Sequence, residues 1–135
     1  MKWLRPYRLA TYLLVLFCAG HTIGGMLAQK PLGPGADAVF AMMKSVHFTF
    51  NGADCTWYGF WFAFGLTVSL FLAFSAVVAW QLDRWWNGPI AWSLLGAHAV
   101  NTWFSWRYFF AGPGVFSTLI TALLAIGAWR RQPDV

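Results

Sequence analysis

Three histidines, His21, His47 and His98, are the side chains of this sequence best suited to proton transfer near neutral pH. A neutral imidazole can also bind a haem iron or accept a hydrogen bond from a small molecule. Six further polar residues are expected near one of these histidines: Thr22, Asn51, Asp54, Tyr58, Asn101 and Arg107. Together the nine residues are the candidates for a ligand-binding site, and they include a proton carrier, a carboxylate and a cation.

Each candidate also has a purely structural interpretation. Imidazole and amide groups commonly hydrogen-bond one transmembrane helix to another, which would account for His21, His98 and Asn101. His47 and Asp54 are also typical of an ordinary solvated loop. Both interpretations stay open until the elements that position these residues are considered.

Other catalytic and binding motifs are absent from the sequence. It contains no glycine-rich phosphate-binding loop, no Gly-x-Ser-x-Gly elbow and no His-Glu-x-x-His or Cys-x-x-Cys spacing. We therefore expect no metal site, and neither a catalytic residue nor a particular cofactor is indicated. Cys18 and Cys55 are expected at different depths, too far apart for a disulfide.

The composition indicates which solvent the chain faces. Hydrophobic residues make up 59% of the 135 residues and charged residues only 10%, against roughly 25% charged residues in an average soluble domain. Aromatic residues make up 20%, which excludes a disordered chain. The nine basic residues form no stripe of the kind that binds nucleic acid. The sequence therefore predicts an integral membrane protein whose surroundings are the lipid bilayer.

Four apolar stretches are long enough, or nearly so, to cross a bilayer as helices, for which about 20 residues are needed. They cover residues 9–28, 57–82, 89–110 and 115–129. The last stretch is short, but Pro113 suits the first turn of a helix and would extend it. We expect an all-α, polytopic protein in which residues 1–135 form a single domain with four transmembrane helices.

The long connection between the first two stretches, residues 29–56, is expected outside the membrane. Its first part is rich in proline and glycine and must be irregular. Mostly apolar residues then recur at helical spacing: Ala36, Val39, Phe40, Met43, Val46, His47 and Phe50. This pattern predicts one short amphipathic helix that lies on the outer interface or caps the bundle.

Positive charges indicate the orientation of the chain. One side of the expected membrane holds Lys2, Arg5, Arg8, Arg84, Arg130 and Arg131, and the other holds Lys30, Lys44 and Arg107. Because lysine and arginine are retained on the cytoplasmic side, both termini are expected there. The first helix could alternatively be a cleaved signal peptide, but Met26 stands where cleavage requires a small residue. We therefore expect the helix to be retained.

Depth in the membrane brings three candidates together. His21, His98 and Asn101 are expected roughly 14 to 18 Å from the inner ends of their helices. Small residues at four-residue spacing would let the first and third helices approach closely: Gly20, Gly24 and Ala28 on one, and Ser93, Ala97, Asn101 and Ser105 on the other. We interpret this level as a polar cavity in the outer half, with the remaining candidates at its mouth.

Four segments of the sequence read as motifs: Gly20-His21-Thr22-Ile23-Gly24, Met43-Lys44-Ser45-Val46-His47-Phe48, Gly59-Phe60-Trp61-Phe62-Ala63-Phe64-Gly65-Leu66, and Ser105-Trp106-Arg107-Tyr108-Phe109-Phe110. Over nearly its whole length the chain resembles a family of small, uncharacterised four-helix bacterial membrane proteins with these features in this order. The resemblance implies a bacterial inner-membrane location. It also implies that His21 and His47 belong to family motifs, whereas His98 matches none, and it brings no established activity.

We expect the outer-half cavity to bind a small lipophilic molecule, or the bundle to support a larger membrane complex as a subunit. One alternative is an isomerase or hydrolase that acts on a lipid-like substrate through His21 and His47. Another is a haem- or quinone-binding subunit for electron transfer. A more distant similarity to the sterol-isomerase-like superfamily carries over no activity, because the expected helices contain no acidic residue.

Overall fold

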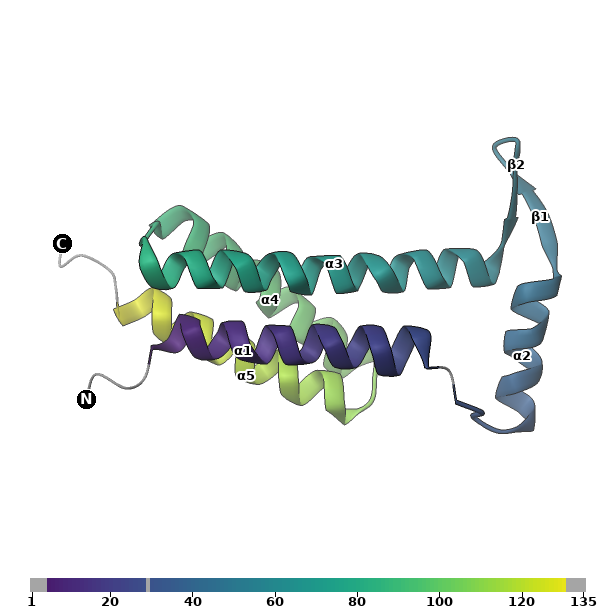
Figure 1. Cartoon of the computed structure of the whole chain (residues 1–135), viewed down its shortest axis with the longest axis horizontal. Helices are drawn as coiled ribbons and strands as arrows, with labels where there is room; N and C mark the ends of the chain where they lie inside the picture. The colour runs from purple at the N-terminus through teal and green to yellow at the C-terminus, as the bar shows by residue number, and fades with distance from the viewer. Residues whose placement is uncertain (1–4, 29, 131–135) are drawn as a thin grey trace. The chain divides into compact units, whose positions relative to one another are not determined.

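The computed structural model describes residues 5–28 and 30–130, and helices account for 82% of them (Figure 1). Helix α1 (Pro6–Ala19) continues as a π-helical segment, η1 (Gly20–Leu27). The elements that follow are α2 (Pro34–Ser45), β1 (His47–Phe50), β2 (Ala53–Thr56), α3 (Trp57–Arg84), α4 (Gly88–Tyr108) and α5 (Ala111–Arg130). The long helices are therefore confirmed, and a small antiparallel hairpin is added to them.

Three helical stretches are long and apolar enough to cross a membrane, namely Pro6–Leu27, Trp57–Arg84 and Ala111–Arg130. The fold is therefore of the kind found in helical membrane proteins. Helix α5 begins at Ala111, four residues before the expected start, because Pro113 is accommodated in its first turn. The transmembrane character of the expected stretch 89–110 stays a prediction.

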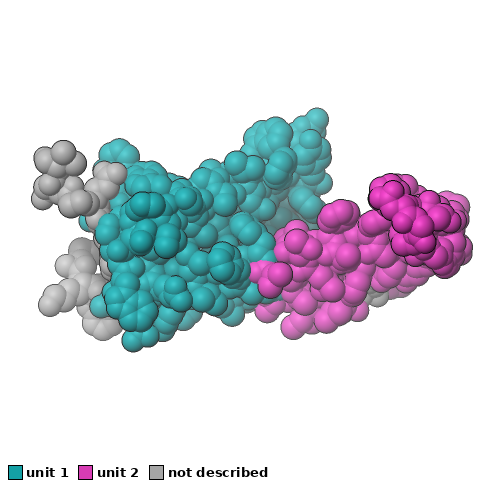
Figure 2. Space-filling model, turned by 90° about the horizontal axis from the view of Figure 1, so that it is seen from above, with its two compact units in different colours: residues 1–18, 71–135 teal, residues 19–70 magenta. Residues whose placement is uncertain are grey.

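The chain divides into two compact units (Figure 2). Unit 1 contains the described residues up to Cys18 and those from Phe71 onward, and unit 2 contains Ala19–Leu70. Helix α3 contributes its first half to unit 2 and its second half to unit 1. Each unit has its own set of polar contacts.

Unit 1 is a helical bundle whose core is built from apolar positions three or four residues apart. The fully buried core side chains include Leu14 of α1, Leu72 of α3, and Ile120 and Leu124 of α5. Helices α4 and α5 are joined by hydrogen bonds between side chains: Asn101 to Ser117 at 3.2 Å, Ser105 to Ser117 at 3.0 Å, Thr102 to Thr121 at 2.8 Å and Trp106 to Thr118 at 2.9 Å. These bonds satisfy most of the polar groups that make α4 less apolar than its neighbours.

Unit 2 shows that the prediction for the outer loop is wrong beyond Ser45. Helix α2 ends there, and His47 and Phe50 lie in strand β1. The backbone reverses at Asn51 and Gly52, whose φ angles of 51° and 84° are those of a type I′ hairpin turn. The segment forms a hairpin because Phe48 and Phe50 alternate as in a strand and are followed by an Asn-Gly turn. These two signals outweigh the helical spacing of the apolar residues.

Aromatic packing anchors the hairpin to the beginning of α3. The ring of Phe48 lies 5.0 Å from Trp57 and 5.9 Å from Phe60, and Phe50 meets Phe60 edge-on at 6.2 Å. Helix α2, in contrast, has no buried residue. An amphipathic helix with exposed apolar side chains is the form expected of an interfacial segment.

Most residues of the two predicted ridges of small residues are exposed. Gly20 and Gly24 are exposed, and a Cβ atom on either would have no atom of the described residues within 4 Å. On α4, Ser93 and Ala97 are exposed. The buried residues of α4 are Ala91, Leu94, His98 and Ser105, so Ser105 is the buried member of the predicted ridge. In unit 2 the close approach is made at Gly65 of α3, where the side chain of Met26 occupies the position of the missing Cβ.

Candidate functional site

The segment η1 gives the first candidate site its unusual backbone. Three of its eight residues, Gly20, Gly24 and Gly25, have no side chain to crowd a widened turn. The amide of Ala28 donates to the carbonyl of Ile23 at 2.7 Å, which is the i to i−5 bond of a π-helix. Such segments are rare and are found frequently at functional sites. The motif around His21 therefore coincides with a distinct local geometry.

His21 of η1 reaches the backbone of α3. Its Nε2 atom lies 3.0 Å from the carbonyl oxygen of Gly65. A carbonyl oxygen only accepts hydrogen bonds, so the proton of the neutral imidazole must be on Nε2, and Nδ1 must be an acceptor. No described residue donates a hydrogen bond to this Nδ1 atom. The imidazole is therefore held in one tautomer, and its Nδ1 atom is an acceptor that no described residue uses.

Two hydroxyl groups complete the arrangement around Gly65. Thr22 Oγ1 donates to Ser69 Oγ at 2.7 Å, and Ser69 Oγ donates to the Gly65 carbonyl at 3.4 Å. The carbonyl therefore receives bonds from both His21 and Ser69. We call these four residues, His21, Thr22, Gly65 and Ser69, the His21 cluster. Gly65 and Ser69 were not among the sequence candidates, because a backbone acceptor leaves no mark in a side-chain motif.

A second group of candidates lies in the hairpin. His47 Nδ1 is 2.9 Å from Asp54 Oδ2 and 3.1 Å from Oδ1. The strand register pairs His47 with Thr56, and residue 49 with Asp54, which puts the two side chains on one face of the hairpin. Both are exposed, so the ion pair contributes little to stability. Asn51 occupies the turn.

Tyr58 belongs to an aromatic group at the start of α3. Its ring lies 5.6 Å from Trp61 and 6.0 Å from Phe62, and the ammonium of Lys44 lies 4.6 Å from its centre. These contacts explain the residue as part of the packing between α2 and α3, within the range expected for a cation above an aromatic ring.

The candidates of unit 2 therefore lie in two places that differ in their position along the axis of α3. The hairpin pair lies beside Thr56, just before the helix begins, whereas the His21 cluster meets α3 at its ninth residue, Gly65. Eight residues of helix correspond to a rise of roughly 12 Å. His21 and Thr22 are brought together, as are His47 and Asp54, but the two pairs are not brought to one point.

Three sequence candidates lie in unit 1. His98 is fully buried and stacks on Phe71 with 5.0 Å between ring centres, and neither ring nitrogen has a hydrogen-bond partner among the described residues. Asn101 donates to Ser117, and the guanidinium of Arg107 lies over Tyr108 at 5.4 Å. Asn101 therefore links helices, as its structural interpretation suggests.

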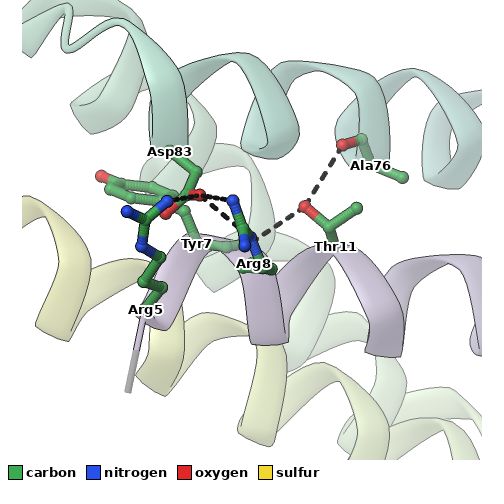
Figure 3. A network of polar contacts seen from close by, with 6 residues as sticks. All are labelled: Arg5, Tyr7, Arg8, Thr11, Ala76 and Asp83. Atoms are coloured by element: carbon green, nitrogen blue, oxygen red, sulfur yellow. Dashed lines mark hydrogen bonds and ion pairs between the residues drawn. The ribbon is translucent and has the colours of Figure 1, made fainter. Parts of the chain in front are cut away.

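Sequence reasoning missed the most deeply buried charge of the described chain. Asp83 lies in the last turn of α3, and its carboxylate binds Arg5 and Arg8 near the start of α1 (Figure 3). The expected helix 57–82 ended two residues too early, which assigned Asp83 to a turn. The usable signal was an acidic residue at a helix end opposite two arginines three residues apart.

The described residues contain neither a cluster of metal ligands nor a disulfide. No group of three or more His, Cys, Asp or Glu side chains there could hold a metal ion. Cys18 and Cys55 are not joined by a disulfide.

In comparisons with known proteins, no family model, no curated protein and no solved structure matches this chain. The fold by itself shows three helices that are long and apolar enough to cross a membrane, as in a helical membrane protein. What the chain does within that class has to be argued from the geometry of its polar groups.

Proposed function

We propose that this chain is an integral membrane protein that binds a small lipophilic molecule with a hydroxyl group at the His21 cluster. The observation that carries the proposal is the bond from His21 Nε2 to the Gly65 carbonyl, which makes Nδ1 an acceptor that has no donor among the described residues. A hydroxyl group on the ligand would supply that donor. Leaving such a group without a partner in an apolar medium is unfavourable, so the site favours occupation.

The surroundings of the cluster support a lipophilic body for the ligand. His21 lies within the apolar stretch Pro6–Leu27. Exposed apolar side chains flank it in unit 2, among them Ile23 and Leu27 of η1 and Phe64 of α3. A polar head held by His21 and an apolar body along these side chains is the arrangement typical of small-molecule sites.

The proposal includes four membrane-spanning helices. Helix α4 has 21 residues, which give a length of about 32 Å and match a hydrocarbon core of about 30 Å. Its polar side chains are largely satisfied by α5, which lowers the cost of placing them in lipid. The proposal also includes a bacterial inner-membrane location, as the resemblance on the sequence motifs implies.

The proposed orientation, with both termini in the cytoplasm, can be tested by labelling. Cysteines are introduced singly at Gly35 and Arg130 in a chain without Cys18 and Cys55. A membrane-impermeant maleimide should label Gly35→Cys in intact cells, and Arg130→Cys only after permeabilisation, because arginines gather at the Arg130 end. Labelling of Arg130→Cys in intact cells would contradict the proposed orientation and place this end of the chain outside the cytoplasm.

Replacing His21 by leucine tests the ligand site. Loss of the bond to the Gly65 carbonyl should by itself cost only about 0.6 kcal/mol, the typical strength of an interhelical bond in a bilayer, so the His21→Leu protein should stay folded. The lipophilic molecule extracted with the parent protein should be lost, together with the stabilisation that it provides. The measurements are mass spectrometry of organic extracts and thermal unfolding in detergent.

His47→Leu is the matched control, because this exposed histidine belongs to the hairpin pair instead of the cluster. It should retain the ligand in full. A folded His21→Leu protein with unchanged ligand content would rule out the proposed contact.

The geometry supports the alternatives less well. An isomerase or hydrolase that uses both His21 and His47 would need the two imidazoles at one substrate group, but they meet α3 at different levels. A role in electron transfer stays a prediction that the absorption spectrum of the purified protein tests.

A further inference from the structure

The carboxylate of Asp83 is the centre of a polar network at the end of unit 1 where α1 begins and α3 ends (Figure 3). Arg5 NH1 lies 3.2 Å from Asp83 Oδ2, and Arg8 approaches the same oxygen with NH2 at 2.9 Å and Nε at 3.1 Å. Nearby, Thr11 Oγ1 donates to the carbonyls of Tyr7 at 2.9 Å and Ala76 at 3.5 Å. The network holds the start of α1 against α3.

The charges of this network do not cancel. The side chain of Asp83 is 1% exposed, and it is the only acidic residue among those described in unit 1. A buried carboxylate requires a positive partner, but one arginine would be enough for neutrality. Counted over the described residues of the network, the second guanidinium therefore leaves a net charge of +1.

Both arginines have donors left for another molecule. Each guanidinium carries five N–H groups in a planar fork, and the bonds to Asp83 use one nitrogen of Arg5 and two of Arg8. The side chains of Arg5 and Arg8 are 55% and 37% exposed. Both side chains are therefore partly accessible to a ligand, while the carboxylate that holds them is buried.

The place of the arginines in the fold indicates where a ligand would come from. The guanidinium of Arg8 lies 5.3 Å from the ring centre of Trp80, and the rings of Tyr7 and Trp86 lie 6.1 Å apart. Tryptophan and tyrosine gather at the headgroup level of membranes. Arg84 and Arg130, at the ends of α3 and α5, add further positive charge to this end.

We propose that Arg5 and Arg8 form a binding site for the phosphate group of an anionic lipid headgroup, with Asp83 as the positioning residue. The guanidinium fork matches two oxygens of a phosphate group. The bonds to Asp83 hold both side chains in place before the ligand arrives, which reduces the entropy lost on binding. The proposal concerns the opposite end of α1 from η1 and does not depend on the His21 cluster.

The test measures thermal stabilisation of the purified full chain in a neutral detergent. Phosphatidylglycerol should raise the unfolding temperature more than phosphatidylcholine does, and the difference should shrink as salt is added. In Arg5→Gln and Arg8→Gln the concentration of phosphatidylglycerol needed should rise about tenfold, the effect of losing one strong charge-assisted bond. Equal responses of the parent protein to the two lipids would overturn the assignment to a lipid headgroup, and with no response to inorganic phosphate they would overturn the site itself.

Arg84→Gln is the matched control, because Arg84 lies over Trp85 at 5.2 Å and has no bond to Asp83. It should bind phosphatidylglycerol as tightly as the parent does. If Arg84→Gln weakened binding as much as Arg8→Gln does, the affinity would depend only on the overall positive charge, and a defined site would be refuted. Inorganic phosphate forms a further arm. Stabilisation by this ion alone, abolished in Arg8→Gln, would keep the phosphate site and assign it to free phosphate.

Arg8→Lys keeps the test decisive if Arg8→Gln does not fold. Lysine retains a charge for Asp83 but replaces the fork by a single ammonium group. The variant should bind phosphatidylglycerol several-fold more weakly than the parent. Binding as tight as that of the parent would contradict recognition by the guanidinium of Arg8.

Discussion

Replacing Arg5 and Arg8 together by glutamine should lower the free energy of unfolding by about 3–5 kcal/mol, the usual cost of leaving a buried charge without its partner. The side chain of Asp83 is almost fully buried, and among the described residues its carboxylate forms ion pairs with Arg5 and Arg8. Each single replacement should cost less than half of this, because the other arginine still pairs with the carboxylate. Denaturation of the purified protein in detergent measures all three values.

Asp83→Asn separates this explanation from a general loss of hydrogen bonds. The two arginines are partly exposed and can turn their guanidiniums to water when the carboxylate is removed. The variant should therefore be clearly more stable than the double arginine variant. Equal destabilisation by the two changes would show that burial of the carboxylate is not the dominant effect.

Gly127→Ala should destabilise unit 1 by about 1–3 kcal/mol through overpacking. A Cβ atom at Gly127 would lie 2.7 Å from Tyr7 Cε2 and 2.9 Å from Cζ. The ring of Tyr7 is rigid and buried, and it is bounded by Trp86. It cannot turn aside as a flexible side chain would, so the backbones of α1 and α5 must separate.

Gly96→Ala is the corresponding control in α4. A Cβ atom there meets no described atom within 4 Å, and alanine favours a helix over glycine by about 1 kcal/mol. Thermal unfolding should show a neutral or stabilising effect for Gly96→Ala and a lowered midpoint for Gly127→Ala. A lowered midpoint for both would point to a property of glycine itself instead of the contact with Tyr7.

The long helices follow from the sequence to within a few residues, apart from the start of α5. Helix α3 begins at Trp57 as expected, because the apolar run begins there. It ends at Arg84, beyond the last apolar residue, Leu82, since Asp83 finds charged partners on α1 and stays helical. A helix end that depends on a partner from another helix cannot be located from the apolar run alone.

The outer loop shows how two local patterns compete. Apolar residues continue at helical spacing to Phe50, yet the chain leaves the helix after Ser45. The Asn51-Gly52 turn was the local signal for a hairpin. Its effect depends on Phe48 and Phe50 finding Trp57 and Phe60, a contact that exists only once α3 is in place.

Composition and apolar run length are properties of single residues or of neighbours along the chain. The sequence by itself therefore determined the long helices, their apolar character and His21 as a candidate. The partners of the polar groups were decided by the tertiary structure. Gly65 is 44 residues from His21, and Asp83 is at least 75 residues from its arginines. Hydrogen bonds and ion pairs act over about 3 Å, so they depend on which faces of the packed helices meet.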